Sequence, residues 1–291
     1  MAWLDAFLMG LLEGFTQYLP LSSFGHALWA MDIRGISAPP LLLAVMLQLG
    51  GAMAVLVVYW RDFYRVLTEA LSMLTDCISN AYIYFHNRRT PDHHVPYNRV
   101  VVGTWRVITF LLLLSSAITA LLGYLARNLV AKAVSSPLLL GAFFLVTGLF
   151  LLVTDLSRVG GRKSAKEAGP ETGIWLGIAQ GVASFPGISR FGLTFCAGLM
   201  CGLSRRFMAK FSCMMSVPAS IGASFLIWDA WSDPALTADA AQGIVMAAFV
   251  AFICGLFLCK TIVKLFAKAP LVAFALYDMA FGGVILLRAF R

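Results

Sequence analysis

The hydrophobic positions of this chain are grouped into long apolar stretches. A helix needs about 20 apolar residues to cross a hydrocarbon core about 30 Å thick. Several stretches approach that length, and charged residues, Pro or Gly bound each of them. They lie at roughly 39–59, 104–126, 136–155, 211–228, 242–259 and 270–287. The pattern predicts six membrane-spanning helices, of which the fourth should be kinked by Pro218.

Two further apolar regions, near residues 2–31 and 173–203, are interrupted by polar residues, Gly and Pro. The first is broken at Glu13-Gly14, Gln17, Pro20 and Ser22-Ser23. The second is broken at Gln180-Gly181, Pro186-Gly187 and Ser189-Arg190. Non-helical backbone at membrane depth is tolerated only where it is buried in protein or lines a wet cavity. Both regions are therefore predicted to form re-entrant helical hairpins.

Residues 60–103 form the one long polar loop region between the apolar stretches. An interfacial helix is expected near 64–85, followed by a solvated loop. His86, His93 and His94 lie in this part of the chain. Their spacing and the flexible composition around them favour a loop over a metal site.

Composition confirms that the chain is too apolar for a soluble protein. Hydrophobic residues make up 60% and charged residues 12%, and the mean hydropathy is +0.84. Soluble domains carry roughly 45–50% apolar and about 25% charged residues. We expect a single polytopic, all-α integral membrane domain over residues 1–291. This excludes a secreted enzyme, a cytosolic enzyme and an ordinary nucleic-acid binder.

The net charge of +8 is expected to lie in cytoplasmic loops, where basic residues orient a membrane protein. With both hairpins returning to their own side, one face of the predicted topology holds 16 Lys and Arg and the other holds five. Both termini should then lie outside the cytoplasm. The six cysteines contain no CxxC pair, and they are expected to be free thiols.

An internal repeat relates the two broken regions. A shift of 167 residues places Glu13 on Gln180, Ser22 on Ser189, Ser23 on Arg190 and Gly25 on Gly192. The repeat halves are roughly 1–155 and 156–291, and the predicted topology gives them opposite orientations. Inverted repeats with broken helices commonly hold a polar ligand near the midplane of the membrane.

The residues at the breaks suit an anionic head group. Half-helix N-termini present unpaired N–H groups, and Gly25, Gly187 and Gly192 allow close backbone approach. Arg190 offers a planar fork for phosphate. Hydroxyls come from Ser22, Ser23, Ser189 and Thr194. The residues alone leave open whether Glu13 and Arg190 form a structural ion pair, and whether His26 is structural or catalytic.

Two long motifs carry a resemblance to a known family. LEGFTQYLPLSSFGH at 12–26 and FPGISRFGLT at 185–194 resemble the two signatures of the undecaprenyl-diphosphate phosphatase family linked to bacitracin resistance. Weaker similarity is found in LQLGGAMAV at 47–55, FSCMMSVPASIGA at 211–223 and FALY at 274–277. The order and spacing agree over nearly the whole chain.

The resemblance implies six spanning helices with two re-entrant hairpins in a bacterial cytoplasmic membrane protein. It also implies hydrolysis of undecaprenyl diphosphate to the monophosphate and phosphate at a site facing away from the cytoplasm. This reaction recycles the carrier lipid for peptidoglycan and confers bacitracin resistance. A Mg²⁺ or Ca²⁺ ion at Glu13 is expected, and a homodimer is left open. The implied catalytic residues are Glu13, Ser23, His26 and Arg190. The implied substrate-binding residues are Gln17, Ser22, Gly25, Gly187, Ser189, Gly192 and Thr194.

The chain departs from the family pattern near the predicted site. Gln17 replaces a second acid, and Phe24 and Phe191 replace a Thr and a Ser. Asp278 stands where the family has Arg, and it could compensate for Gln17 if the two residues met. The alternative to the enzyme is a polyprenyl-phosphate transporter, a flippase or a lipid-binding relative without hydrolysis, because many secondary transporters share the inverted repeat.

Overall fold

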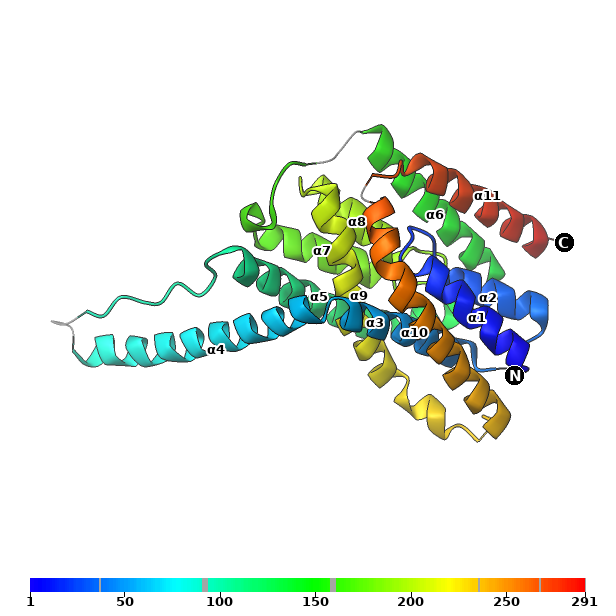
Figure 1. Ribbon diagram of the computed structural model, residues 1–291, viewed down its shortest axis with the longest axis horizontal. Coiled ribbons are helices and arrows are strands. Elements are labelled where there is room, and N and C mark those ends of the chain that lie inside the picture. The colour runs from blue at the N-terminus through cyan, green and yellow to red at the C-terminus, as the bar shows by residue number, and fades with distance from the viewer. Residues whose placement is uncertain (37, 91–93, 158–160, 235, 267, 291) are drawn as a thin grey trace.

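The computed structural model describes residues 1–36, 38–90, 94–157, 161–234, 236–266 and 268–290. Within these ranges the regular structure is helical, apart from an isolated bridge between Lys163 and Leu203. Figure 1 shows the helices packed as one bundle from which α4 projects. The α-helices are α1 (Trp3–Thr16), α2 (Ser23–Arg34), α3 (Pro40–Val58), α4 (Trp60–Arg89), α5 (Thr104–Val134), α6 (Pro137–Leu156), α7 (Pro170–Val182), α8 (Arg190–Met200), α9 (Arg205–Leu226), α10 (Ala238–Phe266) and α11 (Val272–Ala289).

Five helices are long and apolar enough to cross a membrane, namely α3, α5, α6, α10 and α11. They match five of the six predicted spans. The sixth prediction, 211–228, falls within α9, which is 22 residues long but is not among these five. Its apolar content is diluted by Pro218 and by a serine at every fourth position from 212 to 224.

The two interrupted regions form pairs of short helices. α1 and α2 have 14 and 12 residues, and α7 and α8 have 13 and 11. Each is shorter than the ~20 residues that a span requires. Within each pair, the helices are joined by a turn of six or seven residues. The turns contain Pro20 and Ser22 or Pro186-Gly187 and Ser189, whereas Glu13-Gly14 and Gln180-Gly181 lie inside α1 and α7.

The short helices pack on helices from the other half of the chain. α1 lies against α10, and α7 lies against α5. Since α7 is the repeat counterpart of α1, this exchange interlocks the two halves. α6 and α11 also meet across the halves, at Gly141 and Gly282. A Cβ atom on either glycine would meet the other's carbonyl oxygen, so these small residues allow the close approach that membrane helices favour.

The predicted polar region contains a longer helix than expected. α4 covers 30 residues and follows α3 after Tyr59 alone. The chain then returns along α4. The Asn80 side chain donates to the Asn98 carbonyl and accepts from the Asn98 N–H, and the Asn87 side chain makes the same two bonds to Val95. His93 lies outside the described residues, and no group of three or more metal-ligating side chains occurs among those described.

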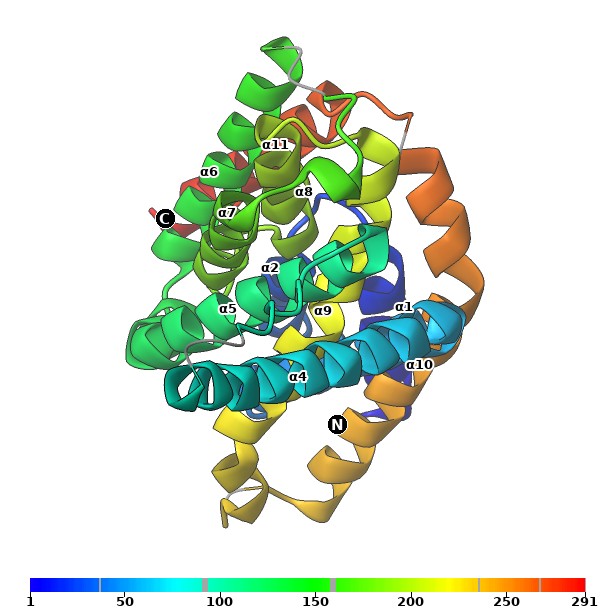
Figure 2. The ribbon, with the colours of Figure 1, turned by 90° about the vertical axis from the view of Figure 1, so that its left-hand side faces the viewer.

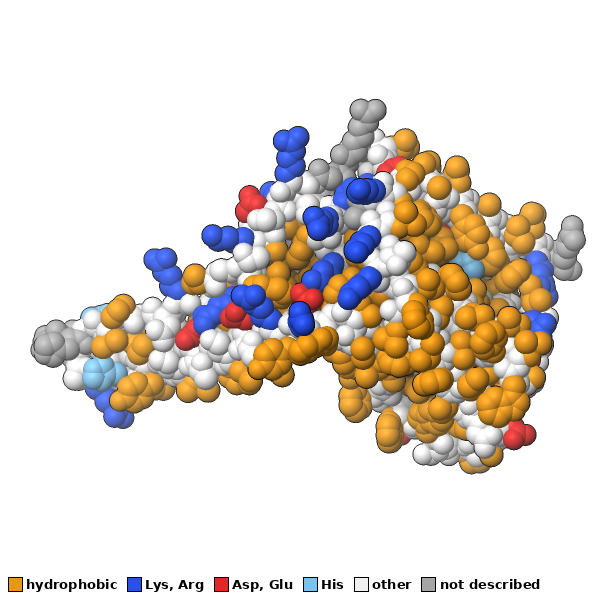
Figure 3. Space-filling model, in the orientation of Figure 1, with side chains coloured by type: hydrophobic (Ala, Val, Ile, Leu, Met, Phe, Trp, Pro, Cys, Tyr) orange, Lys and Arg blue, Asp and Glu red, His pale blue; other side chains and the backbone are white. Residues whose placement is uncertain are grey.

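The distribution of ends and charges is polarised. Figure 1 shows both termini at the end of the molecule away from α4, as expected if they lie on one face. Figure 3 shows Lys and Arg side chains gathered on the α4 side of the bundle, whereas apolar side chains cover most of the remaining surface in that view. This arrangement agrees with the predicted charge bias between two faces.

Candidate active site

The two helical hairpins meet at the N-termini of α2 and α8. Ser22 caps α2 by accepting a hydrogen bond from the Gly25 N–H at 3.2 Å, and Ser189 caps α8 by accepting one from the Gly192 N–H at 3.0 Å. Serine is a favoured N-cap residue because its hydroxyl accepts from an otherwise unpaired N–H. The two copies of the sequence repeat therefore form the same capping structure.

The caps also join the hairpins to each other. The Ser22 hydroxyl accepts from the Gly187 N–H at 3.0 Å, and the Ser189 hydroxyl donates to the Leu21 carbonyl at 3.2 Å. Thr147 of α6 donates to the Gly187 carbonyl and accepts from the Ser189 N–H. The two turns are held against each other as one unit.

A further pair of hydrogen bonds follows the repeat. The Gln17 side-chain amide donates to the Gln48 carbonyl at 3.1 Å, and the Gln180 amide donates to the Met215 carbonyl at 3.0 Å. Residues 48 and 215 differ by the same 167 positions as the hairpin motifs. α3 and α9 are thus structural counterparts.

Glu13 and Ser23 form a hydrogen-bonded pair at the first hairpin. The Ser23 hydroxyl donates to Glu13 Oε1 at 3.1 Å, and Glu13 is only 1% exposed. Glu13 lies in the last turn of α1, and Ser23 is the first residue of α2. The hairpin turn brings together a hydroxyl and a carboxylate that are ten residues apart.

Arg190 enters from the second hairpin. One terminal nitrogen of its guanidinium donates to Gln48 Oε1 at 2.7 Å, and the other donates to the Ser220 hydroxyl at 3.4 Å. Arg190 and Glu13 interact electrostatically, but no ion pair forms between them within the described chain. The structural ion pair that the sequence left open is therefore not formed.

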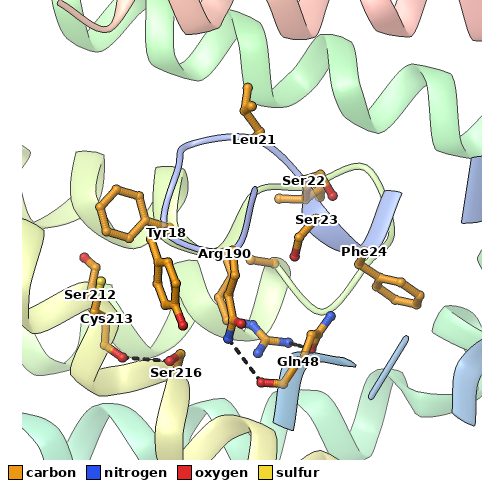
Figure 4. A pocket seen from close by; sticks show the side chains of 14 residues that line it. Tyr18, Leu21, Ser22, Ser23, Phe24, Gln48, Arg190, Ser212, Cys213 and Ser216 are labelled. Atoms are coloured by element: carbon orange, nitrogen blue, oxygen red, sulfur yellow. Dashed lines mark hydrogen bonds between the residues drawn. The ribbon is translucent and has the colours of Figure 1, made fainter. Parts of the chain in front are cut away.

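Two cavities adjoin this cluster. A small cavity of about 30 Å³ has a lining that is half polar and half apolar, and its polar side chains include Gln17, Ser22, Ser23, Gln48 and Arg190. It is large enough for water, which needs roughly 10–15 Å³. Figure 4 shows the side chains of Ser23, Gln48 and Arg190 near one another in this region, with the Arg190–Gln48 bond dashed.

The second cavity is much larger and mostly apolar, with a volume of about 550 Å³. Phe24, Gln48 and Arg190 line both cavities. The large cavity extends along α5 to Tyr124 and Arg127, near the end of that helix. It connects a cationic group to an apolar channel, which suits an amphipathic ligand with an anionic head.

The structure separates the predicted site residues into two groups. Gln17, Ser22, Ser23 and Arg190 line the small cavity, and Glu13 is bonded to Ser23. Other predicted residues use their polar atoms or their small size inside the hairpins. Direct contact of these residues with substrate stays a prediction, and their observed bonds give them a scaffolding role. They are Gly25, Gly187, Ser189, Gly192 and Thr194.

The prediction that His26 acts as the base for Ser23 does not fit the geometry. His26 Nδ1 contacts the Ser22 carbonyl at 2.7 Å, so that nitrogen must donate. Nε2 then accepts from the Tyr277 hydroxyl at 2.8 Å. Ser23 instead bonds Glu13, so Glu13 is the group positioned to take its proton.

The departures from the family pattern have distinct surroundings. Phe24 lies in the wall between the two cavities. Phe191 also lines the small cavity, and it packs against Phe195 and Phe266 in the core. Asp278 is fully buried on α11 but lines neither cavity, so the structure does not bring it to Gln17.

Sequence reasoning missed Gln48 and the serine stripe of α9. Ser212 and Ser216 line the small cavity and Ser220 bonds Arg190. Two signals could have found them. A lone glutamine interrupts the apolar run of residues 40–58, and serines spaced by four residues fall on one face of a helix.

The donor set accepts a hard cation only in part. Glu13 is the one carboxylate at the cluster, and Gln17 Oε1 is buried without a hydrogen-bond partner in the described structure. The amide oxygen lies against Gly51, where a Cβ atom would overlap it. Mg²⁺ is commonly bound by one or two carboxylates together with substrate phosphates and water, so Glu13 and the Gln17 oxygen could supply only part of its ligands.

Comparison with known proteins gives a consistent result. The family model described as "Bacitracin resistance protein BacA" matches residues 6–284. Undecaprenyl-diphosphatase from Desulforapulum autotrophicum is 30% identical over 289 residues, covering 97% of this chain and 96% of the relative. Undecaprenyl-diphosphatase from Desulfosudis oleivorans is 32% identical over 279 residues, covering 96% and 95%. With its described helices and paired hairpins, the chain belongs to the bacitracin resistance protein BacA family.

Proposed function

We infer that this chain is an integral membrane phosphatase that hydrolyses undecaprenyl diphosphate to undecaprenyl phosphate and inorganic phosphate. Family membership and relatives with this activity in their names support the reaction. The observation that carries the inference for this chain is the meeting of the Ser23–Glu13 pair and Arg190 at the junction of the two hairpins.

In the proposed reaction, the Ser23 oxygen attacks the terminal phosphorus. A bond forms between these atoms as the bond from phosphorus to the bridging oxygen breaks, and undecaprenyl phosphate leaves. The Ser23 proton passes to Glu13, which already accepts its hydrogen bond. Water then cleaves the phosphoserine, which restores Ser23 and releases phosphate. Direct attack by a water held at Glu13 is the alternative for the first step.

Arg190 is proposed to neutralise the diphosphate oxygens as the bridging bond breaks. Fixed cations contribute strongly in a water-poor site because no reorganisation is needed during the reaction. Gln48 is a positioning residue, since its side-chain oxygen accepts from the Arg190 guanidinium at 2.7 Å. Ser220 supports the other terminal nitrogen.

A Mg²⁺ or Ca²⁺ ion is proposed at Glu13, with Gln17 and the diphosphate supplying further oxygen ligands. A divalent ion would supply additional positive charge for the phosphate oxygens. The unpartnered Gln17 oxygen supports this proposal. Glu13, Ser23 and Arg190 hold and orient the reacting groups through the contacts described above.

The proposed membrane topology is based on the repeat. We propose that α9 is the sixth span, because its counterpart α3 is one of the five apolar helices and both accept the equivalent glutamine bond. The α1–α2 and α7–α8 pairs would then be re-entrant hairpins in an inverted repeat. The basic face would lie in the cytoplasm of a bacterial cell, with the termini outside.

The large apolar cavity is proposed as the route for substrate from the outer side. It reaches Tyr124 and Arg127, which lie toward the C-terminal end of α5. The other end of α5, at Thr104, is the one next to the basic α4 region. Its apolar lining suits the first isoprene units, with the diphosphate at Arg190. The active site would accordingly open away from the cytoplasm.

The test is phosphate release by the purified full-length protein in detergent, with farnesyl or undecaprenyl diphosphate and with or without Mg²⁺ or Ca²⁺. Ser23→Ala and Arg190→Ala should each abolish release, while the matched controls Ser224→Ala and Arg206→Ala should retain it. Saturable lipid binding that depends on Arg190 without any phosphate release would overturn the phosphatase in favour of a carrier.

A further inference from the structure

α4 carries a continuous apolar stripe that no other part of the described chain covers. Its large side chains are between 56% and 73% exposed. At about 100° per residue, their positions fall within an arc of roughly 80°. We call this set the α4 stripe; it consists of Trp60, Tyr64, Leu67, Leu71, Leu74, Ile78, Tyr82 and Phe85.

The opposite face of α4 is occupied by polar contacts. The return segment bonds Asn80 and Asn87, and Arg106 of α5 binds Asp76 at 2.5 Å and Glu69 at 3.4 Å. These contacts fix the rotation of α4 about its own axis. The polar contacts therefore keep the α4 stripe on the side of the helix that faces away from the return segment and α5.

The position of α4 relative to the bundle is also fixed. Asp62, near its start, pairs with Lys210 of α9 at 2.6 Å. Figures 1 and 2 show α4 running across the direction of α10 instead of beside it. In Figure 3 apolar side chains follow the lower edge of α4, while most Lys and Arg side chains of this region lie above that edge.

The basic residues around α4 indicate that this region binds a negatively charged surface. In the described structure, Arg61, Arg88, Arg89 and Arg99 have no carboxylate partner, whereas Asp62, Glu69 and Asp76 are paired. Helices that lie in a membrane interface combine Lys or Arg with an apolar face of Trp, Phe and Leu. Aromatic residues at both ends of the α4 stripe suit the headgroup level.

We propose that α4 lies in the plane of the membrane surface, with the α4 stripe at the boundary of acyl chains and head groups and its free arginines against anionic phospholipid. The helix thus acts as a peripheral lipid-binding element on the basic side of the bundle. This assignment depends on α4 and its neighbours and is independent of the phosphatase chemistry.

The test compares two nitroxide labels on the full-length protein in vesicles of phosphatidylglycerol and phosphatidylcholine. Both labelled proteins carry Cys201→Ser and Cys254→Ser, because these thiols are also partly exposed. One label is at Leu71→Cys with Cys77→Ser, and the other is at native Cys77, which is exposed about 100° from the centre of the stripe. The label at position 71 should collide several-fold more with oxygen than with a water-soluble nickel complex. The label at Cys77 should show the reverse preference.

Arg88→Gln combined with Arg89→Gln should reduce the oxygen preference at position 71, as should vesicles of phosphatidylcholine alone. An unchanged circular dichroism spectrum serves as the control for folding. Nickel access at position 71 equal to that at Cys77 would overturn the proposal. Spin–spin broadening at position 71 would also overturn it, in favour of a second copy of the chain seated on the stripe.

Discussion

The Ser22 hydroxyl accepts a hydrogen bond from the Gly187 N–H at 3.0 Å, although the two residues are 165 positions apart. The same hydroxyl caps α2 through Gly25. One side chain thus caps the N-terminus of a helix and links the two hairpins. The geometry of the Ser23–Glu13 pair and of Arg190 depends on this junction, because both lie next to a capping serine.

Ser22→Ala should destabilise the protein more than the loss of an ordinary helix cap. It leaves two buried N–H groups without an acceptor, each at a cost of about 1–3 kcal/mol. The measurement is thermal unfolding in detergent. Ser136→Ala is the control, because Ser136 caps α6 through the Leu139 N–H alone. Equal losses in melting temperature would show that the hairpins are not coupled through Ser22.

Gln48→Leu should lower kcat/KM by about ten- to a hundredfold, since a hydrogen bond to a charged group is worth roughly 1.5–3 kcal/mol. The physical reason is the loss of the 2.7 Å contact that positions Arg190. Ser220→Ala removes the longer 3.4 Å contact and should cost less. Gln48→Glu, which keeps an acceptor, should recover part of the activity; no recovery would contradict the positioning role.

His26→Gln should keep phosphate release within about tenfold of the unsubstituted protein, whereas Glu13→Gln should lower it by about 10²–10⁴-fold, the usual contribution of a general base. The difference follows from the partner of the Ser23 hydroxyl, which is Glu13. Tyr277→Phe removes the other His26 contact, and it should lower the free energy of unfolding by about 1 kcal/mol. A loss in His26→Gln as large as that in Glu13→Gln would restore His26 as the base.

Gln17→Glu should raise the dependence of phosphate release on Mg²⁺ or Ca²⁺. The substitution places a second carboxylate at a position whose amide oxygen is now unpartnered, and hard cations prefer carboxylate oxygens. The measurement is activity against metal concentration after chelation. Gln17→Leu, which removes both the oxygen and the bond to the Gln48 carbonyl, is the control. Identical metal curves for Gln17→Glu and the unsubstituted protein would exclude position 17 from the metal site.

The sequence was sufficient to predict five of the apolar helices and the two interrupted regions that form pairs of short helices, because each depends on local composition. α3, α6 and α11 begin and end within two residues of their predicted stretches. The full length of α4 was less evident. Its apolar positions are separated by polar ones along the chain, and they form a surface only once the helix is built.

The motifs identified Glu13, Ser23 and Arg190, but they did not show the partner of each. The pairing of Ser23 with Glu13 instead of His26 depends on how the first turn is folded. Gln48 reaches Arg190 through packing between helices that lie far apart in sequence. Such contacts are properties of the tertiary arrangement, so no local pattern reports them.

Ser23 and Arg190 occupy equivalent positions of the repeat, as do Glu13 and Gln180. Two identical chains related by a twofold axis would present the same side chain on both sides of the junction. The proposed nucleophile on one side and the cation on the other require two different copies. Two repeats in one chain can meet this requirement, because each repeat can change its sequence independently while both stay covalently linked.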